Sequence, residues 1–81
     1  MSSATRSEAL NAEIRAWMAR RRITQSEVAG PLGVTQTQVS ARLWGRIAWR
    51  VDELWIVTDL LGIDLPTLLT AAASAEQEAS A

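Results

Sequence analysis

The sequence predicts an all-α fold, a compact domain of five helices, and three observations support it. Apolar residues recur at spacings of three and four, as along one face of a helix. Three Thr-x-x-Glu or Thr-x-x-Gln patterns mark helix starts. A hydrophobic content of 48% with four Gly and two Pro argues against disorder, and no strand pattern is present. The 81 residues suit one domain, which we place at residues 6–72, between an N-terminal arm (1–5) and a flexible tail (73–81).

The first helix is expected to run from residue 6 to residue 20 or 22. Thr5 and Glu8 have the spacing of a capping box, in which the hydroxyl accepts a backbone N–H three residues ahead. The arginines at residues 20–22 suit the negative end of a helix dipole. One apolar stripe is expected to face the core: Leu10, Ile14, Trp17 and Met18.

The second helix is expected over residues 25–32 and the third over residues 36–44. A capping box opens each of them: Thr24 with Glu27, and Thr35 with Gln38. Gly33 between them is typical of the left-handed residue that ends a helix. Pro31 lacks an N–H and crowds the preceding turn, so we expect a distorted last turn there. Two short helices joined by a tight turn containing Gly are typical of a helix-turn-helix.

The fourth helix is expected over residues 51–61, after a loop that Trp49 should anchor against the body of the domain. Gly62 ends this helix, and Asp64 caps a short fifth helix that carries Leu65, Leu68 and Leu69. The residues after this helix have no apolar periodicity beyond small side chains, which is why we expect a tail.

The composition excludes most catalytic and metal chemistry. The chain has no Cys, His or Tyr. Disulfides, thiolate metal sites and imidazole bases or ligands are therefore ruled out. We expect no enzyme activity, no metal site and no cofactor. No apolar run approaches the ~20 residues that span a bilayer, so we expect a cytoplasmic protein with no membrane partner.

The net charge of −1 hides a strong asymmetry along the chain. Residues 1–50 hold all eight Arg and three Glu, a net charge of +5. Residues 51–81 hold six acidic residues and no basic one, a net charge of −6. This pattern indicates an electropositive face carried by the first half, although chance segregation in a small protein would look the same.

Four short groups of residues follow one another along the second and third helices, and their spacing taken together is specific. They are Thr24-Gln25-Ser26-Glu27, Gly33-Val34-Thr35-Gln36, Val39-Ser40 and Gly45. Further groups follow: Arg42-Leu43-Trp44, Trp49, Asp52-Glu53-Leu54 and Leu61-Gly62-Ile63. Together they resemble the lambda-repressor-like (XRE, Cro/CI-type) helix-turn-helix family over residues 8–70, and most closely its actinobacterial and actinophage subgroup. The resemblance implies a five-helix domain whose third helix enters the major groove of double-stranded DNA, usually as a dimer on a palindromic site.

The third helix presents short, uncharged side chains on the side away from Val39. Amides and hydroxyls can pair with base edges, and an alanine can touch the thymine methyl. We therefore expect five base-reading residues: Gln36, Thr37, Gln38, Ser40 and Ala41. The resemblance implies that Gln25 contacts phosphate and supports Gln36. A polar face with no partner is the alternative.

Six residues are expected at the DNA backbone: Gln25, Thr35, Arg42, Trp44, Arg46 and Arg22. Arg42 could instead pair with Asp52 or Glu53. Trp44 could instead fill a gap against the loop or belong to a subunit contact. Arg20 and Arg21 could reach phosphate or only complement the helix dipole.

Exposed apolar residues on the fourth and fifth helices predict a homodimer interface made of Trp55, Ile56, Leu60, Leu65 and Leu69. A C-terminal segment that covers this patch is the alternative. The implied function is a transcriptional regulator, a phage or prophage repressor (phage immunity) or a Cro-like protein, in a bacterial cytoplasm. Two alternatives stay open: an autoregulatory antitoxin, and a protein-interaction module that keeps the fold without reading DNA.

Overall fold

The computed structural model describes the backbone of residues 3–80 and the side chains of residues 6–75 and 77. Five helices and no strand occupy this part of the chain: α1 (Ser3–Arg21), α2 (Gln25–Leu32), α3 (Gln36–Leu43), α4 (Val51–Leu61) and α5 (Leu65–Ser80). The predicted compact all-α fold of five helices is therefore confirmed.

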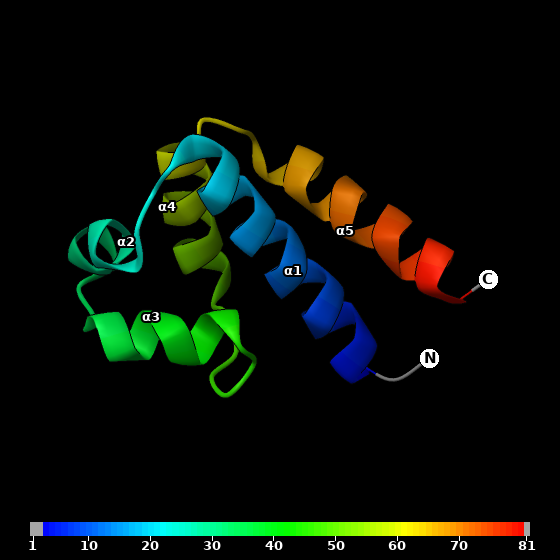
Figure 1. Ribbon diagram of the computed structural model, residues 1–81, viewed down its shortest axis with the longest axis horizontal. Helices are drawn as coiled ribbons and strands as arrows, with labels where there is room; N and C mark the ends of the chain where they lie inside the picture. The colour runs from blue at the N-terminus through cyan, green and yellow to red at the C-terminus, as the bar shows by residue number, and fades with distance from the viewer. Residues whose placement is uncertain (1–2, 81) are drawn as a thin grey trace.

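The helices form two parts that meet along α1 (Figure 1). In one part, α5 lies beside α1 over most of its length. In the other, α2 and α3 stand at one end of the molecule, with α3 along an outer edge. The chain bends by 99° between Val51–Leu61 and Leu65–Ala75, which returns α5 to α1. No single described helix is long and apolar enough to cross a membrane, and only this bent pair meets that standard, by length and composition alone.

The core draws at least one fully buried side chain from every helix: Ile14, Val28, Val39, Val57 and Leu68. Burying such a side chain stabilises a fold by about 1.5–3 kcal/mol. The predicted stripe of α1 faces this core, although Trp17 and Leu10 are only partly buried. All five helices are thus needed to complete one core.

Two predicted helix boundaries are wrong at the ends of the chain. Helix α1 already begins at Ser3, so Thr5 lies inside it and is not its cap. Residues 3–5 therefore belong to the helix and not to an arm, while residues 1–2 lie outside the described part. Helix α5 is long and continues to Ser80, through the segment expected to be a tail. The apolar pattern missed this extension because its inward residues are alanines, which favour helix and allow close packing, as buried Ala72 does.

The inner helices begin and end close to the predicted residues. Helix α2 runs through Pro31 to Leu32, and α4 has the predicted bounds. Helix α3 ends at Leu43, one residue earlier than expected, with Trp44 as its C-cap.

Candidate nucleic-acid interface

Both helices of the α2–α3 unit begin with the predicted capping boxes. The hydroxyl of Thr24 accepts the Glu27 N–H at 3.2 Å, and the Glu27 carboxylate accepts the Thr24 N–H at 3.0 Å. At α3 the Thr35 hydroxyl accepts the Gln38 N–H at 3.1 Å, and Oε1 of Gln38 accepts the Thr35 N–H at 2.9 Å. These bonds satisfy N–H groups that the first turn of a helix leaves without partners.

The turn between α2 and α3 depends on Gly33, whose φ of 70° is left-handed. The N–H groups of Gly33 and Val34 donate to the carbonyls of Gly30 and Ala29, which closes the last turn of α2. A side-chain bond of 2.9 Å, from the Ser26 hydroxyl to Oε1 of Gln36, then ties the start of α2 to the start of α3.

This supporting bond to Gln36 comes from Ser26, which the sequence analysis did not single out. Gln25, to which the resemblance assigned the support, is half-buried and makes no such bond among the described residues. Ser26 follows Gln25 directly, but no pattern within α2 shows which of the two side chains turns toward α3.

Four of the five expected base-reading residues reach the surface of α3. Gln36, Thr37 and Gln38 are exposed and Ser40 is half-buried. Ala41 is buried, so its prediction as a base-reading residue is wrong. The loop after α3 folds back at this point, where the Ala41 carbonyl accepts the N–H groups of Arg46 and Ile47. A helical projection of α3 alone does not include that loop.

The exposed side chain of Gln38 is already engaged at its oxygen. Oε1 accepts the Thr35 N–H in the capping box, which leaves the N–H donors of Nε2 and the second lone pair of Oε1 for an external partner. Thr35 itself has its hydroxyl in the same box, facing its own helix.

Arg15 holds the C-terminal end of α3 to α1. Its guanidinium lies 4.1 Å from the centre of the Trp44 ring and donates a hydrogen bond to the Leu43 carbonyl. Trp44 remains 60% exposed on its outer side. Sequence reasoning did not identify Arg15, because the contact joins residues far apart in the chain and no local spacing marks it.

Trp49 anchors the loop after α3, as predicted. Its indole N–H donates to Oδ1 of Asn11 on α1 at 2.8 Å, and both side chains are largely out of solvent. Asn11 is buried and was not singled out from the sequence. The loop that carries Arg46 is therefore attached to α1, and Arg46 itself is exposed.

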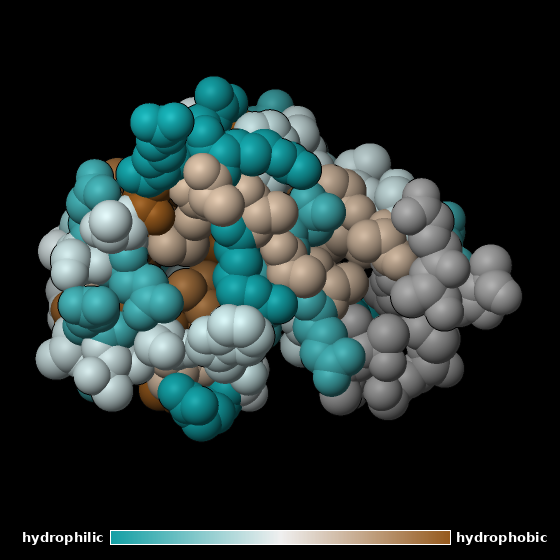
Figure 2. Space-filling view, viewed as in Figure 1, coloured by the Kyte–Doolittle hydropathy of each residue, from teal (hydrophilic) through white to brown (hydrophobic). Residues whose placement is uncertain are grey.

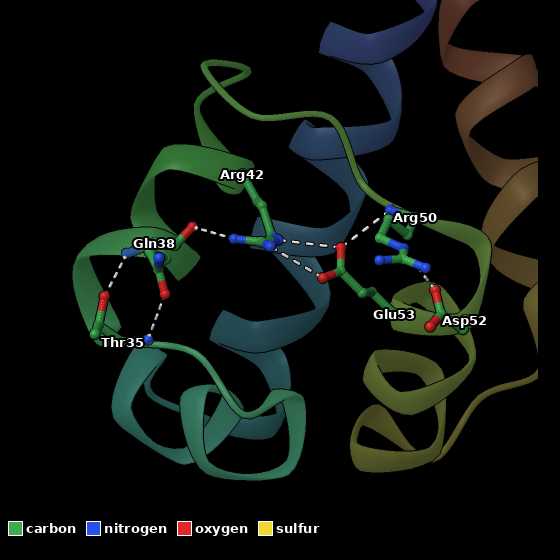
Figure 3. A network of polar contacts seen from close by, with 6 residues as sticks. All are labelled: Thr35, Gln38, Arg42, Arg50, Asp52 and Glu53. Atoms are coloured by element: carbon green, nitrogen blue, oxygen red, sulfur yellow. Dashed lines mark hydrogen bonds and ion pairs between the residues drawn. The ribbon is translucent and has the colours of Figure 1, made fainter.

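Arg42 pairs with Glu53, the second of the two roles considered for it (Figure 3). The two nitrogens Nε and Nη2 donate to the two carboxylate oxygens at 3.1 and 3.0 Å. The Arg42 hydrogen bonds lower the pKa of the Glu53 carboxyl, against the opposing effect of burial, and the Arg50 N–H also lowers it. The guanidinium of Arg42 is thus turned toward α4, which corrects its assignment to the DNA backbone.

Three further arginines lie at the end of α1. Helix α1 ends on the side away from α3 (Figure 1); Arg20 and Arg21 belong to its last turn, and Arg22 follows next in the chain. Arg20 and Arg21 lie 4.9 and 5.3 Å from the centre of the Trp17 ring. Figure 2 shows strongly hydrophilic side chains along the edge where α1 ends, and paler residues over the end that carries α2 and α3.

The expected dimer residues do not form one exposed patch. Leu65 is buried in the core, so its prediction as an interface residue is wrong. Ile56 and Leu60 are half-buried. Trp55 and Leu69 are exposed by 52% and 46%, but they line different hollows. The sequence could not place the leucines of α5 correctly, because the sharp bend turns α5 against α1 and so decides which of them are covered.

Among the described residues, no group of three potential metal ligands is close enough to hold an ion. Comparisons with protein-family models, with curated proteins and with solved structures found no match to this chain.

Proposed function

We propose that the chain is a sequence-specific DNA-binding transcriptional regulator, a repressor of the lambda-repressor-like class that occludes a promoter. The observation that carries the proposal is the exposed, uncharged start of α3, presented by an α2–turn–α3 unit with a capping box on each helix. A solvated helix face ordinarily carries charged side chains, whereas base edges are read by amides and hydroxyls. Gln36 and Thr37 supply such groups, and Gln38 retains its amide donor.

The arginine distribution supports the proposal in part. The first half of the chain has a net charge of +5, and exposed Arg46 lies in the loop that follows α3. Arg15, stacked on Trp44, adds a cation at the end of α3. Contacts of these side chains with phosphate would orient the domain on the duplex without selecting a sequence.

The proposal is tested by selecting bound duplexes from a random DNA pool at about physiological salt. We expect enrichment of a palindrome, and a binding constant that falls steeply as salt rises. Gln36→Ala should relax base preference at one position, at a cost of about 1–3 kcal/mol in discrimination. Gln77→Ala, the same change on α5, is the matched control and should bind as the wild type does. A folded wild-type protein that enriches no sequence would refute the proposal.

The dimer remains part of the proposal, with a smaller surface than the sequence suggested. Half-sites about one helical turn apart in the selected sequence would support a symmetric dimer. Trp55→Ser should then lower the dimer population in sedimentation by more than its loss of monomer stability explains, because half of this indole is exposed on the single chain. A wild-type monomer at about 100 μM would remove the dimer from the proposal, since operator binding at cellular levels needs tighter association.

A protein-interaction module is the second candidate, favoured by the surroundings of Trp55. This exposed indole lines a hollow with Asp59 and Asp64 at the bend between α4 and α5. Such a module would show neither sequence enrichment nor salt-dependent DNA binding, so the same selection separates the two functions.

A further inference from the structure

A polar network joins α3 to α4 (Figure 3). In it, Nη1 of Arg42 donates to the main-chain carbonyl of Gln38 at 3.0 Å, while the other side of the guanidinium holds Glu53. The side chains of Arg42 and Glu53 are only 11% and 10% exposed. Charge-assisted bonds in so little solvent are stronger and more directional than those on an open surface.

This network spans a gap between the two helices. Within residues 3–80, no Cα atom of α3 lies within 8 Å of a Cα atom of α4, whereas α3 approaches both α1 and α2. The helices share the apolar core through side chains such as Val39 and Leu54. Apolar contacts of this kind fill space but fix orientation weakly, while a planar two-bonded Arg–carboxylate pair fixes both distance and angle.

The network is continued at both of its ends. On the α4 side, Oε1 of Glu53 also accepts the backbone N–H of Arg50 at 3.0 Å, at the first turn of the helix. On the α3 side, Gln38 is bound through its own side chain to the backbone of Thr35. A chain of hydrogen bonds therefore runs from the N-cap of α3 to the start of α4.

We propose that Arg42 and Glu53 are positioning residues for sequence recognition: their pair sets the angle at which α3 presents Gln36 and Thr37 to the bases. This inference rests on the proposed DNA-binding function. Paired contacts to a base edge require placement within about 0.5 Å and 10–20°. A small rotation of α3 would therefore lower discrimination between sequences more than it lowers contact with phosphate.

The test compares two double variants that each remove one ion pair without changing net charge. Arg42→Met with Glu53→Met replaces the network by apolar side chains of similar length, which keeps the site filled. Arg50→Met with Asp52→Met removes the neighbouring exposed pair, whose Nε–Oδ1 distance is 3.4 Å, and serves as the matched control. For each protein we would measure the ratio of binding constants between the selected duplex and duplexes with single base-pair changes.

We expect the Arg42/Glu53 double variant to lose roughly tenfold in this ratio, the size of one paired base contact, while staying folded by circular dichroism. The Arg50/Asp52 control should keep the wild-type ratio. An unchanged ratio in the folded Arg42/Glu53 variant, even with weaker binding to every duplex, would overturn the positioning role and leave the pair a structural one.

Two further outcomes are distinguishable. If the double variant does not fold, Glu53→Gln, which keeps the shape of the side chain and turns an amide toward Arg42, is measured by the same ratio and judged by the same standard. If the wild-type protein itself discriminates between no sequences, the proposed function fails, and the positioning role fails with it. Only discrimination by the wild type with no loss in the variant refutes the positioning role alone.

Discussion

The α2–α3 unit and the α1–α5 pair hold their helices in place by different means. In the α2–α3 unit, hydrogen bonds between residues a few positions apart define where each helix begins and ends. In the α1–α5 pair, the contact is between opposite ends of the chain, through side chains such as Ile14 and Leu68. A helix end is therefore a local property, whereas the buried face of a helix depends on what packs against it.

The sharpest test of the α1–α5 contact uses two neighbouring leucines of α5. Leu68 is fully buried and Leu69 is 46% exposed. Leu68→Ala should lower the free energy of unfolding by about 2–5 kcal/mol, because it leaves a cavity in the core. Leu69→Ala should change it by less than about 0.5 kcal/mol. Urea unfolding followed by circular dichroism measures both, and equal effects would contradict the observed packing of α5.

Acid should weaken the Arg42–Glu53 ion pair, which links α3 to α4. Because Arg42 lowers the folded-state pKa of Glu53 below its ordinary value of 4.5, the unfolded chain binds the proton more readily. The stability from this carboxylate is complete above about pH 4.5 and is lost as the pH falls through the folded-state pKa.

Unfolding measured from pH 7 to pH 3 should therefore show a smaller loss in the Arg42→Met/Glu53→Met variant than in the wild type. Asp64, whose pKa is lowered by its hydrogen bonds with Thr67, contributes equally in both proteins and cancels from the comparison. Identical pH dependence in the two proteins would mean that the Arg42–Glu53 pair contributes no stability.

Removal of the Thr35 hydroxyl tests how much the capping box of α3 stabilises the domain. Thr35→Ala should destabilise the domain by about 1 kcal/mol, or a fall in Tm of roughly 4–8 °C, because it leaves the Gln38 N–H without its acceptor. Thr37→Ala, two residues further along α3, removes no cap and should be neutral or slightly stabilising. Thermal unfolding that ranks the two variants in the opposite order would argue against the capping box.

The smallest expected effect concerns the end of α1. Arg22 has a φ of 55°, in the left-handed region where α2 and α4 end in Gly33 and Gly62. Arg22→Gly should stabilise the domain by about 0.5 kcal/mol, since relief of roughly 1 kcal/mol of strain exceeds the extra entropy of the unfolded chain. Arg21→Gly, at the last residue of α1, should have the opposite sign because Arg21 is not in the left-handed region, and the thermal unfolding of the two variants checks this.

Helix ends could be predicted from the sequence, whereas contacts between distant segments could not. Thr24, Thr35, Gly33 and Gly62 identified the inner helix boundaries, because each acts on backbone groups within five residues of itself. Trp49 was correctly expected to anchor its loop, although its partner, Asn11, could not be named. The exposure of Gln36, Thr37 and Gln38 was predicted correctly, since a short capped helix with polar side chains allows few ways to bury its apolar residues.

Local hydrogen bonding and apolar spacing specify the fold class, the inner helix ends and the polar start of α3, so these features could be predicted from the amino-acid sequence. Packing between distant segments buries Ala41 and Leu65, turns Arg42 toward Glu53 and places Arg15 against Trp44. Each of these outcomes depends on a surface contributed by another segment: the returning loop, the bend before α5, or the side of α1. A residue's spacing within its own helix carries no information about that surface, because the chain brings it there only when the whole core assembles.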